Sequence, residues 1–264
     1  MPSSSLVDQI GLFDTLVPLA SIATIFGVMG FFLSKHESSV AFFLLVWWTS
    51  SVIISLNGSL FSHPDRWSDG DGYGILWIVV FMVGFISTLL LWIQRSHRLR
   101  LFLCKRVPLV GWIVIHTYRL DGLSILFPFL RGNVVPNLLG WQTIVLEVAI
   151  GAGSLPLAWW AYQGTFLSKP WKKDIFGLWN SIGLYDLFSA YVVLILNFLK
   201  LGGKHVTEPP LAFAGVHPLP LLILFQAPLG ILTHIFLLYH LEEILDHQGI
   251  GGRLPLHIRQ IRNR

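Results

Sequence analysis

The sequence predicts an all-α membrane protein, a bundle of about seven transmembrane helices with its N-terminus outside and its C-terminus in the cytoplasm. Three observations lead to this prediction: an apolar composition, long apolar segments that recur along the chain, and basic residues that gather in alternate loops. Hydrophobic residues make up 54% of the 264 residues and charged residues 12%, about half the charged share of soluble domains. A soluble fold of this size could not hide so much apolar surface from water.

Seven apolar segments each have about the 20 residues that a helix needs to cross a hydrocarbon core about 30 Å thick. In chain order they are residues 13–33, 39–57, 74–93, 108–130, 138–161, 177–199 and 219–240. We expect one transmembrane domain over residues 1–264. Its first part, 13–93, contains three uniformly apolar helices, and its second part, 108–240, contains four helices that also carry polar residues.

The distribution of basic residues predicts the orientation. Residues 94–106, after the third span, contain five basic residues and no acidic one, while the segment after the fifth span contains three lysines and the C-terminal tail four arginines. With seven crossings these regions share one side, which the positive-inside rule makes cytoplasmic. The opposite side has the acidic loop 58–73, although loop 201–218, with Lys204 and Glu208, fits less well. We expect a multi-pass protein of the plasma or inner membrane.

Ionisable and amide side chains enter the last four spans. Such groups are costly in hydrocarbon, at roughly 2.5–3.5 kcal/mol for a charged residue on insertion scales. By span, the polar residues are His116, Arg119 and Asp121, then Gln142 and Glu147, then Asn180 and Asp186, then Gln226 and His234. Each of them therefore needs a structural or functional reason.

Helical geometry predicts that five of these side chains meet. At about 1.5 Å per residue, His116, Arg119, Glu147, Asp186 and His234 fall at similar depths, near the middle of the membrane and towards the cytoplasm. The first two are three residues apart and therefore share a helix face. We expect one polar layer built from four helices.

Two further sequence patterns affect the helices that form this layer. Trp179, Gly183 and Asp186 follow i, i+4, i+7 spacing, which gives the sixth span one stripe with a small residue where another helix can approach. In the seventh span, Pro228 has no N–H to donate to the carbonyl of Leu224, so we expect a distorted or kinked helix there.

The favoured hypothesis is an intramembrane polar cavity that binds a small ligand, an anionic one included, or conducts protons or ions, because ionisable groups in membranes commonly mark such sites. The arginine would hold an anionic group, the two acids would neutralise the arginine, and the two histidines would exchange protons. The candidate binding residues are Arg119, Asp186, Glu147, His234, His116 and Asn180.

Two alternatives stay open. His116 and His234 could ligate a haem between the fourth and seventh helices, as in a membrane redox subunit. The protein could instead be a non-catalytic accessory or assembly subunit whose apolar helices pack against other membrane subunits. No metal-ligand spacing, nucleotide loop or nucleophile motif assigns a reaction or a cofactor. Topology explains the basic residues without a nucleic-acid partner.

From the fourth span onward, mainly over residues 108–240, the chain resembles an uncharacterised family of polytopic bacterial-type membrane proteins. The resemblance lies in Tyr118-Arg119-x-x-Gly122, Trp179-Asn180-x-x-Gly183-x-x-Asp186 and Pro228-Leu229 followed by His234. It implies the multi-span architecture and the choice of Arg119, Asn180, Asp186 and His234. It implies no activity and no role for Glu147.

Overall fold

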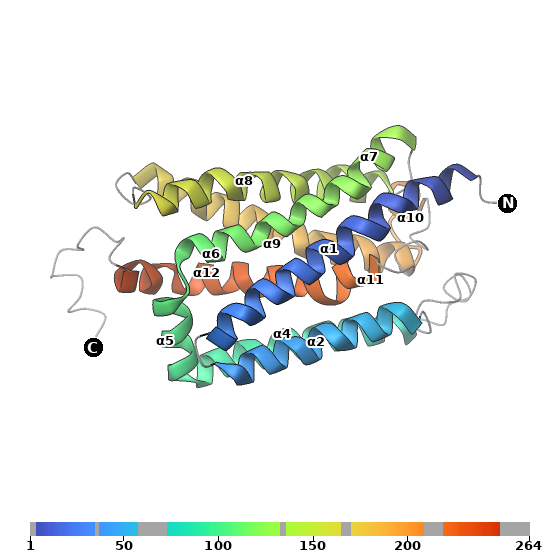
Figure 1. The fold of residues 1–264 in the computed structure, drawn as a ribbon. Coiled ribbons are helices and arrows are strands. Elements are labelled where there is room, and N and C mark those ends of the chain that lie inside the picture. Colours follow the sequence, from blue (N-terminus) through green and yellow to red (C-terminus); the bar gives the residue numbers. More distant parts are fainter. Residues whose placement is uncertain are drawn as a thin grey trace.

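The computed structural model describes residues 4–34, 37–57, 73–132, 136–164, 170–208 and 219–248, and all the regular secondary structure in these ranges is helical. The long helices lie lengthwise against one another in a single bundle (Figure 1). The elements are α1 (Ser4–Ser34), α2 (Ser38–Asn57), α4 (Tyr73–Arg95), α5 (His97–Arg106), α6 (Leu109–Val114), η1 (Ile115–Gly122), α7 (Leu123–Gly132), η2 (Leu139–Ile144), α8 (Val145–Tyr162), α9 (Pro170–Phe198), α10 (Lys204–Thr207), α11 (Leu219–Leu221), η4 (Leu222–Gln226) and α12 (Ala227–Gln248). The predicted all-α class is confirmed.

The predicted apolar segments fall on these helices, and several of the helices are suited to a membrane. Within the described ranges, four helical stretches are long and apolar enough to cross one: Ser38–Leu56, Leu139–Tyr162, Trp171–Asn197 and Leu222–Gln248. A fifth is counted if α4 and α5, which are bent by 93° relative to each other, form one broken span. The described apolar part of α1 is shorter, and the fourth predicted segment changes helix type along its length. The protein is therefore a membrane protein with several apolar helices.

The basic segment after the third predicted span is a helix, α5, where the sequence suggested a loop. The hydroxyl of Ser96 caps it by accepting a hydrogen bond from the N–H of Leu99 at 3.2 Å. Leu99 and Leu103, four residues apart, are buried in the core, whereas Arg98 and Lys105 are exposed. This amphipathic pattern, together with the sharp turn after α4, indicates that α5 lies along the end of the bundle.

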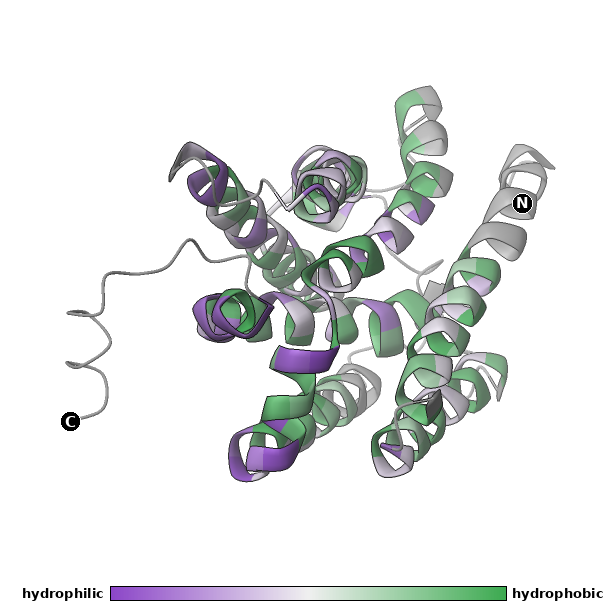
Figure 2. Cartoon of the chain, turned by 60° about the vertical axis from the view of Figure 1, so that its left-hand side comes forward, coloured by the Kyte–Doolittle hydropathy of each residue, from purple (hydrophilic) through white to green (hydrophobic). Residues whose placement is uncertain are grey.

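Basic residues gather at one end of the molecule. In Figure 1, α5, the start of α9 and the end of α12 lie at this end, which we call the basic end, while α10 and the start of α1 lie at the other. Figure 2 turns the basic end forward and shows hydrophilic residues there, on helices that are otherwise mostly hydrophobic. The acidic loop (58–72) and the C-terminal arginines (253–264) lie outside the described residues.

The carbonyl that Pro228 leaves free is used in tertiary packing. It belongs to Leu224, in a π-helical turn at the start of the last long helix. The indole N–H of Trp47 donates to this carbonyl at 2.9 Å, and the hydroxyl of Ser51 lies within hydrogen-bonding distance at 3.4 Å. The predicted distortion is therefore present as a wide turn, and it joins α2 to the bundle core.

Candidate functional site

A buried ion pair lies at the centre of the polar layer. The guanidinium of Arg119, on η1, donates through Nη2 to the carboxylate of Asp186, on α9, and both side chains are 0% exposed. Nη1 of Arg119 lies 3.4 Å from the carbonyl oxygen of Gly183 and 3.4 Å from Nε2 of His234. The structure thus brings together three of the four spans as the sequence predicted.

Asn180 fixes the orientation of His234. Its side-chain oxygen accepts from Nδ1 of His234 at 2.7 Å, and its side-chain nitrogen donates to the backbone carbonyl of the same histidine at 3.1 Å. Because Nδ1 carries the hydrogen, Nε2 can accept from Arg119. His234 is therefore held as a neutral ring whose lone pair faces the guanidinium.

His116 stacks on His234, with ring centroids 4.0 Å apart and planes 27° apart. Nε2 of His116 lies 3.1 Å from the hydroxyl of Thr233, which donates to the carbonyl of Gly230 at 2.9 Å. The imidazole therefore donates to Thr233. Rings stacked face to face at this distance leave no room for a porphyrin between them, so the haem alternative does not fit this geometry.

The fourth predicted span is not one regular α-helix. Residues Ile115–Gly122 form a 3-10 helix, with three residues per turn. This places His116 and Arg119 on one face, towards α9 and α12, and Ile115, Tyr118 and Asp121 on another, towards α1. A 3-10 stretch of eight residues is uncommon, and inside a longer helix it often marks a functional or strained segment.

Two glycines allow the helices to approach closely enough for these contacts. A Cβ on Gly183 would lie 2.5 Å from the ring of His234 and 3.2 Å from Nη1 of Arg119. A Cβ on Gly151, on α8, would lie 3.0 Å from the backbone nitrogen of Leu120, on η1. The close helix approach predicted at Gly183 is confirmed.

Glu147 lies near the ion pair but does not form it. Its Oε2 would be 3.3 Å from a Cβ on Gly122, so the carboxyl packs against the end of η1. Among the residues that the structure describes, Arg119 forms an ion pair with Asp186 alone. Glu147 is partly buried and interacts with Arg119 only electrostatically.

The structure adds Asp121 to the site, which the sequence showed as a polar residue in the fourth span without giving it a role. Its side chain is 5% exposed. With its amide oriented to satisfy both neighbours, Gln226 donates to Oδ2 of Asp121 at 3.0 Å and accepts from the N–H of Ser21 at 3.1 Å. The hydroxyl of Tyr118 donates to the backbone carbonyl of Gln226 at 2.8 Å. Asp121 also interacts electrostatically with Glu147.

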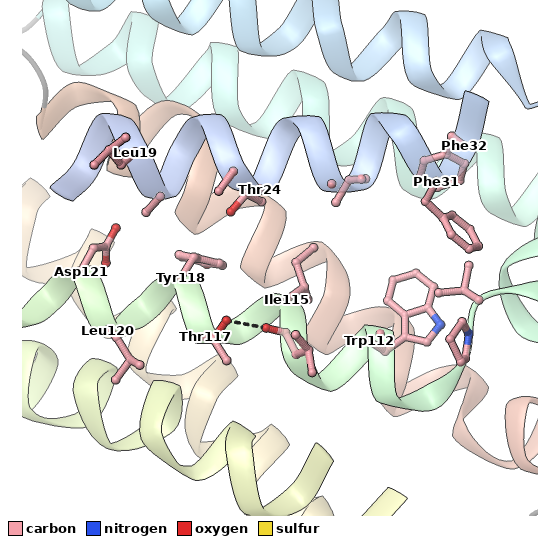
Figure 3. A pocket seen from close by; sticks show the side chains of 18 of the residues that line it. Leu19, Thr24, Phe31, Phe32, Trp112, Ile115, Thr117, Tyr118, Leu120 and Asp121 are labelled. Atoms are coloured by element: carbon pink, nitrogen blue, oxygen red, sulfur yellow. Dashed lines mark hydrogen bonds between the residues drawn. The ribbon is translucent and has the colours of Figure 1, made fainter. Parts of the chain in front are cut away.

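A groove between α1 and the α6–η1 segment ends at Asp121. Its volume is about 860 Å³, within the range of small-molecule pockets. Figure 3 shows its walls: Asp121 and Leu19 lie at one end, and Phe31 and Trp112 lie at the other. The walls are apolar along most of their length, and none of the described residues that line the groove is a lysine or arginine.

The chain matches no protein-family model, no curated protein and no solved structure. The resemblance over residues 108–240 therefore stays a prediction, and the function has to be argued from the geometry of the site.

Three buried polar atoms of the layer have no hydrogen-bond partner among the described residues: Nε of Arg119, Oδ1 of Asp186 and Nδ1 of His116. Buried polar atoms are otherwise almost always hydrogen-bonded, and exceptions commonly occur where a water, an ion or a reacting group takes part. The arrangement can therefore accept protons or a small polar molecule next to the ion pair.

Proposed function

We propose that this is a multi-pass membrane protein with seven spans, an external N-terminus and a cytoplasmic C-terminus, which binds a small lipid-soluble ligand and exchanges protons within the membrane. The ligand would occupy the groove beside α1, and the protons would be held by the carboxyl groups around Arg119. The observation that carries the proposal is that the groove ends at Asp121, two residues from Arg119 on the same 3-10 helix.

The balance of charge supports proton exchange. Among the described residues, the carboxyls of Asp121, Glu147 and Asp186 surround a single guanidinium, that of Arg119. Several uncompensated carboxylates in a low-dielectric interior would be very costly, so such a cluster lowers its energy by binding protons or cations. An acid-rich cluster inside a membrane is typical of proton relays.

The groove suggests the chemistry of the ligand. Its long apolar walls suit a hydrocarbon or ring system, and the carboxyl at its end suits a hydroxyl, an amine or another hydrogen-bond donor. Arg119 is fully buried and bonded to Asp186, so an anion could reach the guanidinium only by displacing Asp186. The geometry therefore favours a neutral or cationic ligand over the anionic one that the sequence suggested.

Asp121→Asn is expected to remove an infrared band from the purified protein. In the proposed mechanism the wild type shows the C=O stretch of a protonated carboxyl at neutral pH, and this band shifts in D2O because the proton exchanges. The asparagine variant should lose part of the band, while Asp174→Asn, at an exposed position on the same bundle, should leave it unchanged. A spectrum without this band, or one insensitive to substitution at Asp121 and Glu147, would contradict proton binding by the cluster.

Filling the groove is expected to displace its ligand. Gly27 lines the groove, and a Cβ there would meet nothing within 4 Å, so Gly27→Phe should place a ring in the groove without disturbing the helix. Gly30→Phe, one turn further along α1, is the matched control because Gly30 also has open space but does not line the groove. Mass spectrometry of organic extracts should find a lipid-soluble compound with the wild type and Gly30→Phe but not with Gly27→Phe. Equal amounts in all three would argue against the groove as its site.

One observation favours a second candidate function, that of a non-catalytic accessory subunit. The side chains of Arg119, Asp186, Asn180 and both histidines are almost completely buried, as expected of polar residues that fix helix packing. In that case Asp121→Asn would lower the melting temperature without changing a proton-exchange signal. The infrared and groove-filling experiments together separate the two functions.

A further inference from the structure

A second group of side chains with metal-ligating atoms lies at the basic end of the molecule, away from the polar layer. Cys104 comes from α5, and His240 and Glu243 come from the last turns of α12. One ligand-type atom from each of the three lies within 4.8 Å of those of the other two. More than 130 residues separate the cysteine from the other two, so no spacing motif in the sequence could show the group.

The donor atoms suit a borderline-soft divalent cation. Zinc accepts a thiolate, an imidazole nitrogen and a carboxylate oxygen in one tetrahedral shell and leaves a fourth position for water. Nδ1 of His240 lies 3.0 Å from Oε2 of Glu243, and these residues are one turn apart on one helix face. Cys104, which is 0% exposed, reaches this face from the neighbouring helix and hydrogen-bonds to Glu243.

The two helices are already held in register at this point. The side-chain nitrogen of Gln248, at the end of α12, donates to the backbone carbonyls of Cys104 at 3.3 Å and Val107 at 2.7 Å. Its side-chain oxygen accepts from the N–H of Leu109 at 3.0 Å. Because these bonds fix α12 against the α5–α6 junction, the three donor groups are positioned without a metal, which lowers the entropic cost of binding.

We propose that Cys104, His240 and Glu243 form a Zn²⁺ site that joins α5 to the end of α12. Bound zinc would help to fix the angle at which α5 leaves α4, in addition to the packing of Leu99 and Leu103 and the bonds of Gln248.

Two features of the site set the conditions for binding. Burial, with a smaller contribution from Glu243, raises the pKa of the Cys104 thiol to about 12. Zinc would therefore release one proton from the thiol as the S–Zn bond forms, and affinity should fall as the pH is lowered. Nε of Arg100 lies 3.9 Å from Oε1 of Glu243 and would have to give up this contact. The Arg100 side chain is 34% exposed and has room to turn towards water.

Cobalt(II) titration of the full-length protein in mild detergent, purified without a histidine tag, tests the site. The wild type is expected to bind one Co²⁺ with a thiolate-to-cobalt charge-transfer band and the visible bands of a tetrahedral ion, and Zn²⁺ should displace it. Cys104→Ser should abolish the charge-transfer band. His240→Ala and Glu243→Gln should each weaken cobalt binding by at least about 10- to 100-fold. A loss of this size is typical even for residues that only hydrogen-bond to a metal ligand.

Glu242→Gln is the matched control for Glu243→Gln. Glu242 is the adjacent residue, and its carboxylate pairs with Lys173, so its substitution should leave cobalt affinity unchanged. Cys104→Ser and Glu243→Gln are conservative changes, and each variant should elute from a size-exclusion column as a single peak. A loss of cobalt binding is then not caused by unfolding. The proposal is overturned if the folded wild type binds no stoichiometric cobalt, or if Cys104→Ser binds cobalt with the wild-type spectrum and affinity.

Discussion

Arg119→Leu is expected to lower the free energy of unfolding by about 3–5 kcal/mol, the usual cost of removing one partner of a buried ion pair. The substitution leaves the Asp186 carboxylate without the guanidinium that it contacts, in a place where neither side chain reaches the surface. It also removes the donor that faces His234 and the carbonyl of Gly183. Reversible unfolding in mixed micelles, followed by circular dichroism, measures the loss.

The double variant Arg119→Leu/Asp186→Leu shows whether the cost comes from the lone carboxylate. Two apolar side chains in place of a buried pair are often neutral or stabilising, so the double variant should be more stable than Arg119→Leu alone. Lys173→Leu is the control, because Lys173 pairs with Glu242 while their side chains are 47% and 42% exposed. Exposed pairs contribute at most about 1 kcal/mol. Equal losses for the two single variants would mean that the buried pair contributes no more than a surface one.

The parts of the structure that depend on local sequence were predictable. Apolar runs of about 20 residues follow from composition and length, and the structure places helices on them. The pairing of Arg119 with Asp186 follows almost as directly, since a guanidinium in a span needs a carboxylate at a similar depth, and Asp186 is one such group. The stripe formed by Trp179, Gly183 and Asp186 needed only the helical period.

The details of the site depend on tertiary contacts and could not be predicted in the same way. The 3-10 segment brings Tyr118 and Asp121 to the groove, and it packs closely against α8 at Gly151. The sequence predicted Glu147 and Asp186 alike as counter-charges for Arg119. Depth along a helix does not show which side of the helix a residue faces. The group at Cys104 joins residues far apart in the chain, and hydropathy contains no information about such contacts.

Taken together, these contacts show why the polar layer lies where it does. Three of the polar side chains meet a glycine of another helix: His234 lies over Gly183, Glu147 lies against Gly122, and the hydroxyl of Tyr118 lies against Gly230. Helices that approach at glycine exclude lipid and water alike, so the hydrogen bonds form in a medium of low dielectric, where they are strong. The glycines are therefore as much a part of the site as the charged residues.

Gly183→Ala tests the close approach at glycine and is expected to destabilise the protein by about 1–3 kcal/mol, the usual cost of overpacking a core. The new methyl group would lie 2.5 Å from Cε1 and Nε2 of His234, so the ring would have to move. Asn180 holds that ring by a hydrogen bond from Nδ1 and also bonds to the backbone carbonyl of His234, which makes the movement costly. Thermal unfolding in detergent measures the change.

Gly177→Ala is the matched control on the same helix, because a Cβ there would meet nothing within 4 Å. It should leave stability unchanged or raise it by up to about 1 kcal/mol, because alanine has a higher helix propensity than glycine. The difference between the two alanine variants isolates crowding, since the chemical change and the helix are the same. In a His234→Ala background the ring is absent, and the cost of Gly183→Ala should largely disappear, which makes the two residues strongly coupled. Equal stability changes for Gly183→Ala and Gly177→Ala would contradict the prediction. They would mean that α9 does not approach His234 closely at Gly183.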